Sequence, residues 1–151
     1  MHSFTAEQWL PISTEDAWKF FSAPKNLALI TPPELGFKIK TKLKNNEIYN
    51  GMIIDYTVKP LLGIPVHWQT EICKVLKPGF FTDRQLKGPY SVWEHTHTFE
   101  KSNGGVLMKD EIIYQLPFGI IGELVHKLTV RNKIKKIFSY RKMILNKLFS
   151  E

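Results

Sequence analysis

The hydrophobic pattern of the chain changes from strand-like to helical near Pro117, and this change restricts the folds open to it. Between Gly36 and Leu116, apolar and polar residues alternate with a period of two, which is typical of antiparallel strands with one buried face. After Pro117 the apolar residues recur at helical spacing to the end of the 151-residue chain. Several strands followed by one helix of about 30 residues, well above the usual ~11–12, predict an α+β fold.

Turn signals divide this pattern into elements. Ser13, followed by acidic residues, caps a short helix, and Pro24 opens a second one. Asn103-Gly104 is the strongest hairpin signal of the alternating region. We expect a single domain, residues 1–151. In it, a curved antiparallel sheet of about seven strands wraps around the long C-terminal helix, with two short helices after the first strand.

The C-terminal helix does not carry one straight apolar stripe. At ~100° per residue its apolar side chains form two groups, about 140° apart, so the buried face should change near Thr129, by a bend or a helix break or by packing against a partner. The first group is Ile121, Leu124, Val125 and Leu128, and the second is Val130, Ile134, Ile137, Phe138, Leu145 and Leu148. We expect Ile134, Phe138 and Leu145 to be buried, and Lys133, Lys136 and Lys147 to be solvated.

The formal net charge of +7 is concentrated in this helix. Between Leu124 and Ser150 there are eight basic residues and no acidic one. Such a run is typical of a solvated helix face, with a membrane-surface patch as the alternative. Nucleic-acid binding is not expected, because the lysines lack interleaved aromatic side chains on which bases could stack.

Cysteine usage and the N-terminal sequence indicate the compartment. The single Cys73 can form neither an internal disulfide nor a thiolate metal cluster. The N-terminal residues show no signal-peptide pattern, and no apolar run reaches the ~18 residues of a membrane span. We expect a cytoplasmic protein.

The segment WEHTHTF carries the densest set of chemically active side chains. The two-residue period places Trp93, His95 and His97 on one strand face. If Asn103-Gly104 forms a two-residue turn, His97 lies opposite Asp110, His95 opposite Ile112, and Trp93 opposite Tyr114. A carboxylate there would favour the charged imidazolium and orient its ring, or would only satisfy buried polar groups.

A metal site is the alternative interpretation of His95 and His97, because two imidazoles on one strand can share an ion. Glu100 falls on the opposite face, and His67 and His126 lie on distant elements. With no evident third ligand, we expect no metal and no cofactor.

The order of elements and several strings resemble the helix-grip superfamily called SRPBCC, which includes START-related lipid-transfer domains, birch-pollen-allergen-like proteins and polyketide cyclases. The strings include YNGMIIDYTVKPLLGIPVHWQTEI, FTDRQLKGPYSVWEHTHTFE and MKDEIIYQLPFGIIGELVHKLTV. The resemblance implies a deep, mostly apolar pocket between the sheet and the long helix. It also implies these cavity or framework positions: Phe81, Asp83, Gln85, Gly88, Pro89, Tyr90, Trp93, His95, His97, Asp110 and Tyr114.

We therefore expect the cavity to bind a hydrophobic or amphipathic small molecule, without catalysis. The candidate ligand-binding residues are Tyr56, Trp68, Gln85, Trp93, His95, His97 and Tyr114. One alternative is a cyclase- or dehydratase-like enzyme in which His95, His97 and Asp110 move protons. Another is lipid exchange or membrane-surface binding through the basic helix. The oligomeric state is left open.

Overall fold

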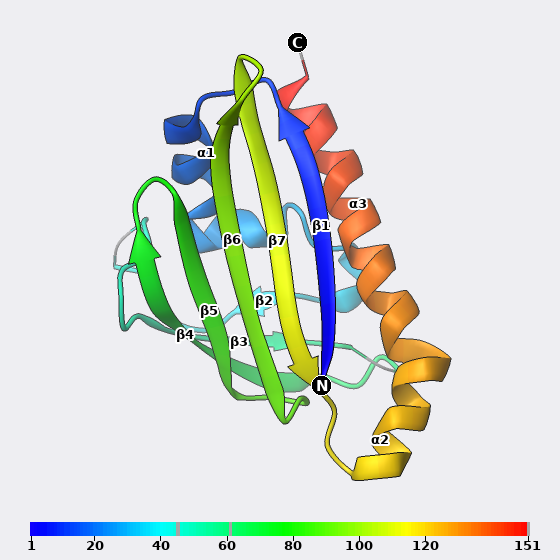
Figure 1. The fold of residues 1–151 in the computed structure, drawn as a ribbon. Coiled ribbons are helices and arrows are strands. Elements are labelled where there is room, and N and C mark those ends of the chain that lie inside the picture. Colours follow the sequence, from blue (N-terminus) through cyan, green and yellow to red (C-terminus); the bar gives the residue numbers. More distant parts are fainter. Residues whose placement is uncertain (45, 61, 151) are drawn as a thin grey trace.

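Seven strands form a single antiparallel sheet that curves around the C-terminal helix (Figure 1). The structure is a computed structural model and describes residues 1–44, 46–60 and 62–150. The strand order is β1-β7-β6-β5-β4-β3-β2, so the first strand pairs with the last. The strands are β1 (His2–Leu10), β2 (Lys38–Ile39), β3 (Ile53–Val58), β4 (Val66–Leu76), β5 (Phe80–Lys87), β6 (Val92–Ser102) and β7 (Gly105–Gln115). The α+β architecture expected from the sequence is confirmed.

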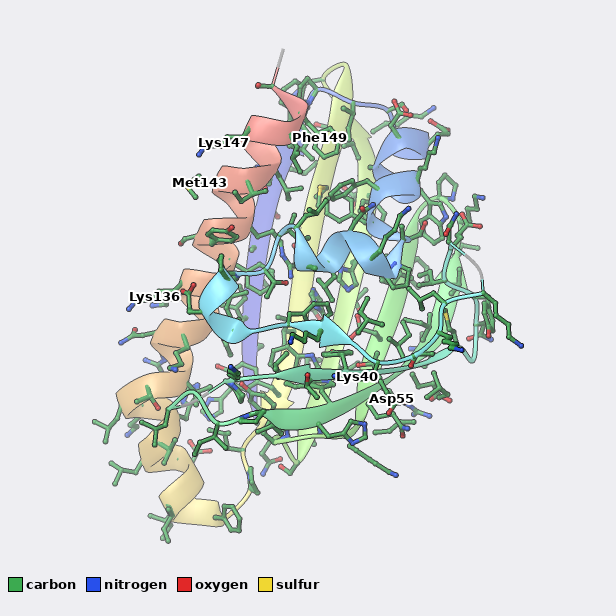
Figure 2. The ribbon with its side chains drawn as sticks, turned by 180° about the vertical axis from the view of Figure 1, so that it is seen from behind. Lys40, Asp55, Lys136, Met143, Lys147 and Phe149 are labelled. Carbon is green, nitrogen blue, oxygen red and sulfur yellow. The ribbon has the colours of Figure 1, made fainter. Side chains whose placement is uncertain are left out.

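The short helices follow β1, as the turn signals predict. Helix α1 (Thr14–Phe21) is capped by Ser13, whose Oγ accepts a hydrogen bond from the backbone N–H of Asp16 at 3.0 Å. Two 3₁₀ turns follow, η1 (Pro24–Ala28) and η2 (Pro33–Leu35), each with a proline in its first turn. These elements cross one end of the space that the sheet encloses (Figure 2).

The C-terminal helix is continuous from Gly119 to Phe149, but its middle turn is wider than an α-helix. Helix α2 (Gly119–Val125) leads into a π-helical turn, η3 (His126–Val130), and then into α3 (Arg131–Phe149). A π-turn holds an extra residue in the turn, and so rotates the side chains before it relative to those after it. The change of face expected near Thr129 therefore occurs as a wide turn within an unbroken helix.

The two apolar groups of this helix have different surroundings. Val130, Ile134 and Leu145 are buried against the sheet, and Phe138 is partly buried. Ile121, Leu124 and Leu128, before and within the π-turn, are exposed. Lys136 and Lys147 point away from the sheet, as expected (Figure 2), whereas Lys133 is half-buried and donates to the Pro60 carbonyl at 2.8 Å. Leu148 is half-exposed, although its spacing placed it in the buried group.

The hydrophobic core has two parts, and polar residues lie between them along two of the elements. On β7, Met108 belongs to one part and Ile112 to the other, with Asp110 between them on the same face. On α3, Arg141 lies between Ile134 and Leu145 in the same way. The first part is built around Trp18 of α1, whose ring meets those of Phe81 and Phe99 edge-on at centroid distances of 5.7 and 6.1 Å.

The burial of α3 predicts different effects for two neighbouring leucines. Leu145 is 1% exposed and Leu148 is 49% exposed. Leu145→Ala leaves a cavity in the core and should lower the free energy of unfolding by about 2–5 kcal/mol. The control, Leu148→Ala, should change it by less than about 0.5 kcal/mol. Urea unfolding followed by circular dichroism measures both, and equal losses would show that the face assignment of α3 is incorrect.

Candidate functional site: a polar cluster facing an apolar cavity

A cavity of about 410 Å³ lies between the sheet and α3. Its wall is mostly apolar and aromatic, with Trp68, Trp93 and Ile112 from the sheet and Ile134 and Phe138 from α3. A smaller compartment of about 80 Å³ lies next to it. The residues shared by both compartments are Leu27, Phe37, Tyr56, Asp83, His97 and Arg141. The polar residues of this set therefore stand at the junction of the two spaces.

The pairing of β5, β6 and β7 brings the polar cluster together. His97 lies opposite Asp110 and His95 opposite Ile112, as the Asn103-Gly104 turn predicts. On the other side of β6, Asp83 of β5 lies opposite His95. Both carboxylates and both imidazoles point to the concave face, since they line the cavity or are buried beside it.

Each histidine of the cluster has a carboxylate partner. His95 Nε2 lies 2.7 Å from Asp110 Oδ1, and His97 Nε2 lies 2.8 Å from Asp83 Oδ2. His97 Nδ1 also lies 3.4 Å from Asp110 Oδ1. The two imidazole rings stack with centroids 3.7 Å apart. Asp110 is thus shared by both histidines, and His97 lies between two acids.

Arg141 brings a buried positive charge from α3 to this cluster. One guanidinium nitrogen lies 3.8 Å from Asp110 Oδ1, which is too long for a hydrogen bond, and the group stands over the Phe138 ring at 4.6 Å from its centroid. Its Nε is buried and has no hydrogen-bond partner among the described residues. The indole Nε1 of Trp68, in the same cavity wall, is also buried and has no hydrogen-bond partner in the described part of the chain.

The electrostatics separate the roles of the two histidines. Burial alone would raise the pKa of Asp110, but hydrogen bonds from His95 and His97 hold it well below its usual range, so the group is ionised. Burial also opposes charge on His97, yet its contacts with Asp110 and Asp83 outweigh this and raise its pKa. Burial and the neighbouring His97 lower the pKa of His95. Of the two histidines, the cluster therefore favours the positive charge on His97 over His95.

Most of the predicted ligand-binding residues lie in the cavity wall: Tyr56, Trp68, Trp93, His95 and His97. Tyr114 lies behind that wall, next to Trp93, and its hydroxyl makes a 2.7 Å hydrogen bond with His126. Gln85 lies outside the wall. Its amide donates to the carbonyl of Tyr90 at 2.7 Å and its oxygen accepts from the Tyr90 N–H at 3.1 Å, so it holds the β5–β6 turn.

Sequence reasoning from periodicity missed two members of the cluster. Asp83 entered only through the family resemblance, although it shares the two-residue period of the buried Phe81. Arg141 was counted with the solvated basic residues. Its spacing from Ile134, Phe138 and Leu145, at seven, three and four residues, places it on the buried stripe of α3 and was the signal for its position.

Asp83 lies where it could be the third metal ligand beside His95 and His97, which was not evident from the sequence. One ligand atom each from Asp83, His95 and His97 lies within 4.8 Å of the others. However, a cation there would have to replace the proton of His97 between its two carboxylates and stand near the Arg141 charge. The hydrogen-bonded arrangement therefore competes directly with metal binding.

Comparisons with known proteins identify the fold. No protein-family model and no curated protein sequence matches the chain. Among solved structures, protein CV1439 from Chromobacterium violaceum is similar, with a TM-score of 0.72, 12% identity, and coverage of 100% of this chain and 99% of that one.

Two further structures agree. TTHA0849 from Thermus thermophilus gives a TM-score of 0.68 at 16% identity, over 99% of this chain and 100% of that one. Ara h 8.0201 gives a TM-score of 0.63 at 16% identity, over 95% of this chain and 97% of that one. The chain has the helix-grip fold. At these identities the likeness concerns the fold alone.

The cluster predicts separate titrations for its two histidines. Nuclear magnetic resonance of the imidazole rings should give His97 a pKa above the ordinary value of about 6.5 and His95 one below it. Asp110→Asn, which removes the charge shared by both, should lower the pKa of His97. If His97 titrates below His95, the charge assignment is incorrect.

The same charge pattern sets a pH dependence of stability. Because folding raises the pKa of His97, its contribution to stability is complete below about pH 6.5 and is lost as pH rises through the folded value. Asp83→Asn should therefore destabilise the protein by about 1.5–3 kcal/mol near pH 6 and by less near pH 9. Asp55→Asn, in the exposed Asp55–His67 pair, is the control and should cost less than about 1 kcal/mol. Equal losses for Asp83→Asn at both pH values would contradict the assignment.

Proposed function

We propose that the protein is a ligand-binding member of the SRPBCC superfamily and that its cavity holds an amphipathic small molecule. The volume of about 410 Å³ falls in the range of small-molecule sites, about 300–1,000 Å³. The helix-grip fold is consistent with a site between sheet and helix. The polar cluster at the junction of the two compartments, beside a mostly apolar and aromatic wall, supports a ligand with one polar end.

Arg141 is the observation that carries this proposal. A buried guanidinium is costly to desolvate unless its donors are satisfied, and its nearest carboxylate oxygen lies at 3.8 Å. A carbonyl or carboxylate group of a ligand would supply the missing acceptor at this position. The aromatic wall of Trp68 and Trp93, beyond the cluster, would receive the apolar part.

The proposal predicts that Arg141 controls the affinity for amphipathic anions. The fluorescent probe anilinonaphthalene sulfonate has an acidic group on an aromatic body and should bind the wild-type protein in the cavity. Arg141→Met keeps an unbranched side chain as far as the position of Nε and removes the charged guanidinium, and should weaken binding about tenfold or more. Lys142→Met, in the neighbouring exposed position, is the matched control and should leave the affinity unchanged.

Native mass spectrometry of the purified protein tests the same site without a probe. A small molecule should co-purify with the wild type and be lost or reduced in Arg141→Met. If the wild type and Arg141→Met bind the fluorescent probe equally, and carry the same co-purifying molecule in equal amounts, the assignment of Arg141 to the ligand's polar end fails.

Acid–base catalysis is a second candidate, which the position of His97 favours. His97 lines the cavity between two carboxylates, so its unprotonated ring can take a carbon-bound proton from the bound molecule and later return it, while Asp83 and Asp110 stabilise the imidazolium that forms. A cyclase- or dehydratase-like reaction on an enolisable carbonyl compound needs such a group. Here Arg141 would hold the carbonyl or enolate oxygen.

A proton-exchange experiment distinguishes this activity from binding alone. Exchange of the acidic carbon-bound hydrogens of a 1,3-diketone in heavy water should be accelerated by the wild type and lost in His97→Gln, while binding of the diketone persists. His67→Gln alters the exposed Asp55–His67 pair and is the control. No acceleration by the wild type would leave the carrier function as the only proposal.

A further inference from the structure

Large apolar side chains are exposed at the N-terminal end of the C-terminal helix, where α2 begins. Phe118 and Ile120 are 81% and 89% exposed. Together they form a surface that we name the apolar tip, made of Phe118, Ile120, Ile121, Leu124 and Leu128. A contiguous exposed apolar patch on a protein surface often marks an interaction site.

Specific contacts hold this end of the helix with its apolar side outward. Gly122 faces inward, where an added Cβ would overlap the Pro117 carbonyl oxygen. Glu123 accepts from His2 Nε2 at 3.0 Å, and the buried His126 bonds to Tyr114. Ile120, Ile121 and Leu124 lie away from these contacts and are exposed to solvent.

The loop between β3 and β4 adds two further apolar side chains. Leu62 is 90% exposed, and Ile64 is also exposed. The hydrogen bond from Lys133 to the Pro60 carbonyl holds this loop against the start of α3. Pro60, Lys133, Lys136 and Ile137 all line the large cavity, so the loop and the helix form its rim.

Positive charge follows the apolar tip along the outer side of the helix. Lys127, Arg131 and Lys135 are exposed and follow Leu124 and Leu128 along the same helix. No acidic residue lies between Leu124 and Ser150. Glu123, the nearest acid on the helix, is paired with His2. Apolar side chains backed by cations match the interface of an anionic bilayer, where the former enter the headgroup region and the latter meet phosphates.

We propose that the apolar tip and the basic residues behind it dock this protein on anionic lipid bilayers, with the cavity rim beside the membrane surface. No described helix has the length and hydropathy to cross a bilayer, so the contact is peripheral. A second copy of the chain fits this surface less well, because pairing it with itself would bring two basic faces together. This docking proposal depends only on the exposed surface and is independent of the proposed cavity ligand. Exchange of a ligand between cavity and bilayer would require both proposals to hold.

Vesicle flotation tests the docking surface. The wild-type protein should float with vesicles of phosphatidylcholine containing phosphatidylglycerol, and binding should fall with added salt and with vesicles of phosphatidylcholine alone. Ile120→Asp combined with Leu124→Asp should reduce the partition coefficient about tenfold or more, because two apolar side chains no longer enter the interface. Leu76→Asp changes an exposed leucine at the far end of β4 and should bind as the wild type.

The outcomes separate this surface from the cavity. Arg141→Met should float as the wild type does, because Arg141 is buried within the site and lies off the surface. Absence of binding by the wild type, or equal binding by the double variant and the wild type, would overturn the proposal. A dimer in size-exclusion chromatography that Ile120→Asp with Leu124→Asp converts to a monomer would also overturn it, in favour of a second copy.

Discussion

The buried carboxylate of Asp110 joins the parts of this molecule. It accepts from His95 on the neighbouring strand β6, lies near His97 of that same strand, and attracts Arg141 from the helix that the sheet encloses. An ionised carboxylate at this depth persists only because these partners compensate its desolvation. The charge on His97 and the electrostatic environment of the Arg141 guanidinium therefore both depend on this one group.

The division of the core into two parts has the same origin. An apolar layer that continued through the position of Asp110 would fill the space between sheet and helix, as it does around Trp18 and around Ile112. Polar side chains interrupt this layer at Asp110 and Arg141, and the cavity lies beside them. The cluster thus lies between the two core parts, and in the proposed function it is also the polar end of the ligand-binding site.

Periodicity and turn chemistry were sufficient to predict the α+β fold and three of the five cluster residues, His95, His97 and Asp110. The Asn103-Gly104 turn determines the register of β6 and β7, and with it the pairing of His97 with Asp110, because the two-residue turn leaves no freedom in the pairing. No comparable turn determines the register of β5, whose pairing with β4 contains register shifts, so Asp83 could not be placed opposite His95. Arg141 was misassigned because its charge outweighed its spacing: a guanidinium on a buried helix face is rare unless a carboxylate faces it, and that carboxylate lies on a distant strand.

The π-turn explains how one helix serves two surfaces. In a regular α-helix through residues 126–130, Ile121 and Leu124 would lie about 140° around the helix from Ile134. The wide turn instead buries His126 against Tyr114, while Glu123 meets His2 of β1. These contacts join the start of the helix to β1 and β7, so that α3 directs Arg141 into the cavity while the apolar side chains of α2 face outward. An exposed surface that is positioned by such hydrogen bonds is a built feature of the fold, and one continuous helix connects this proposed docking surface to the proposed ligand site.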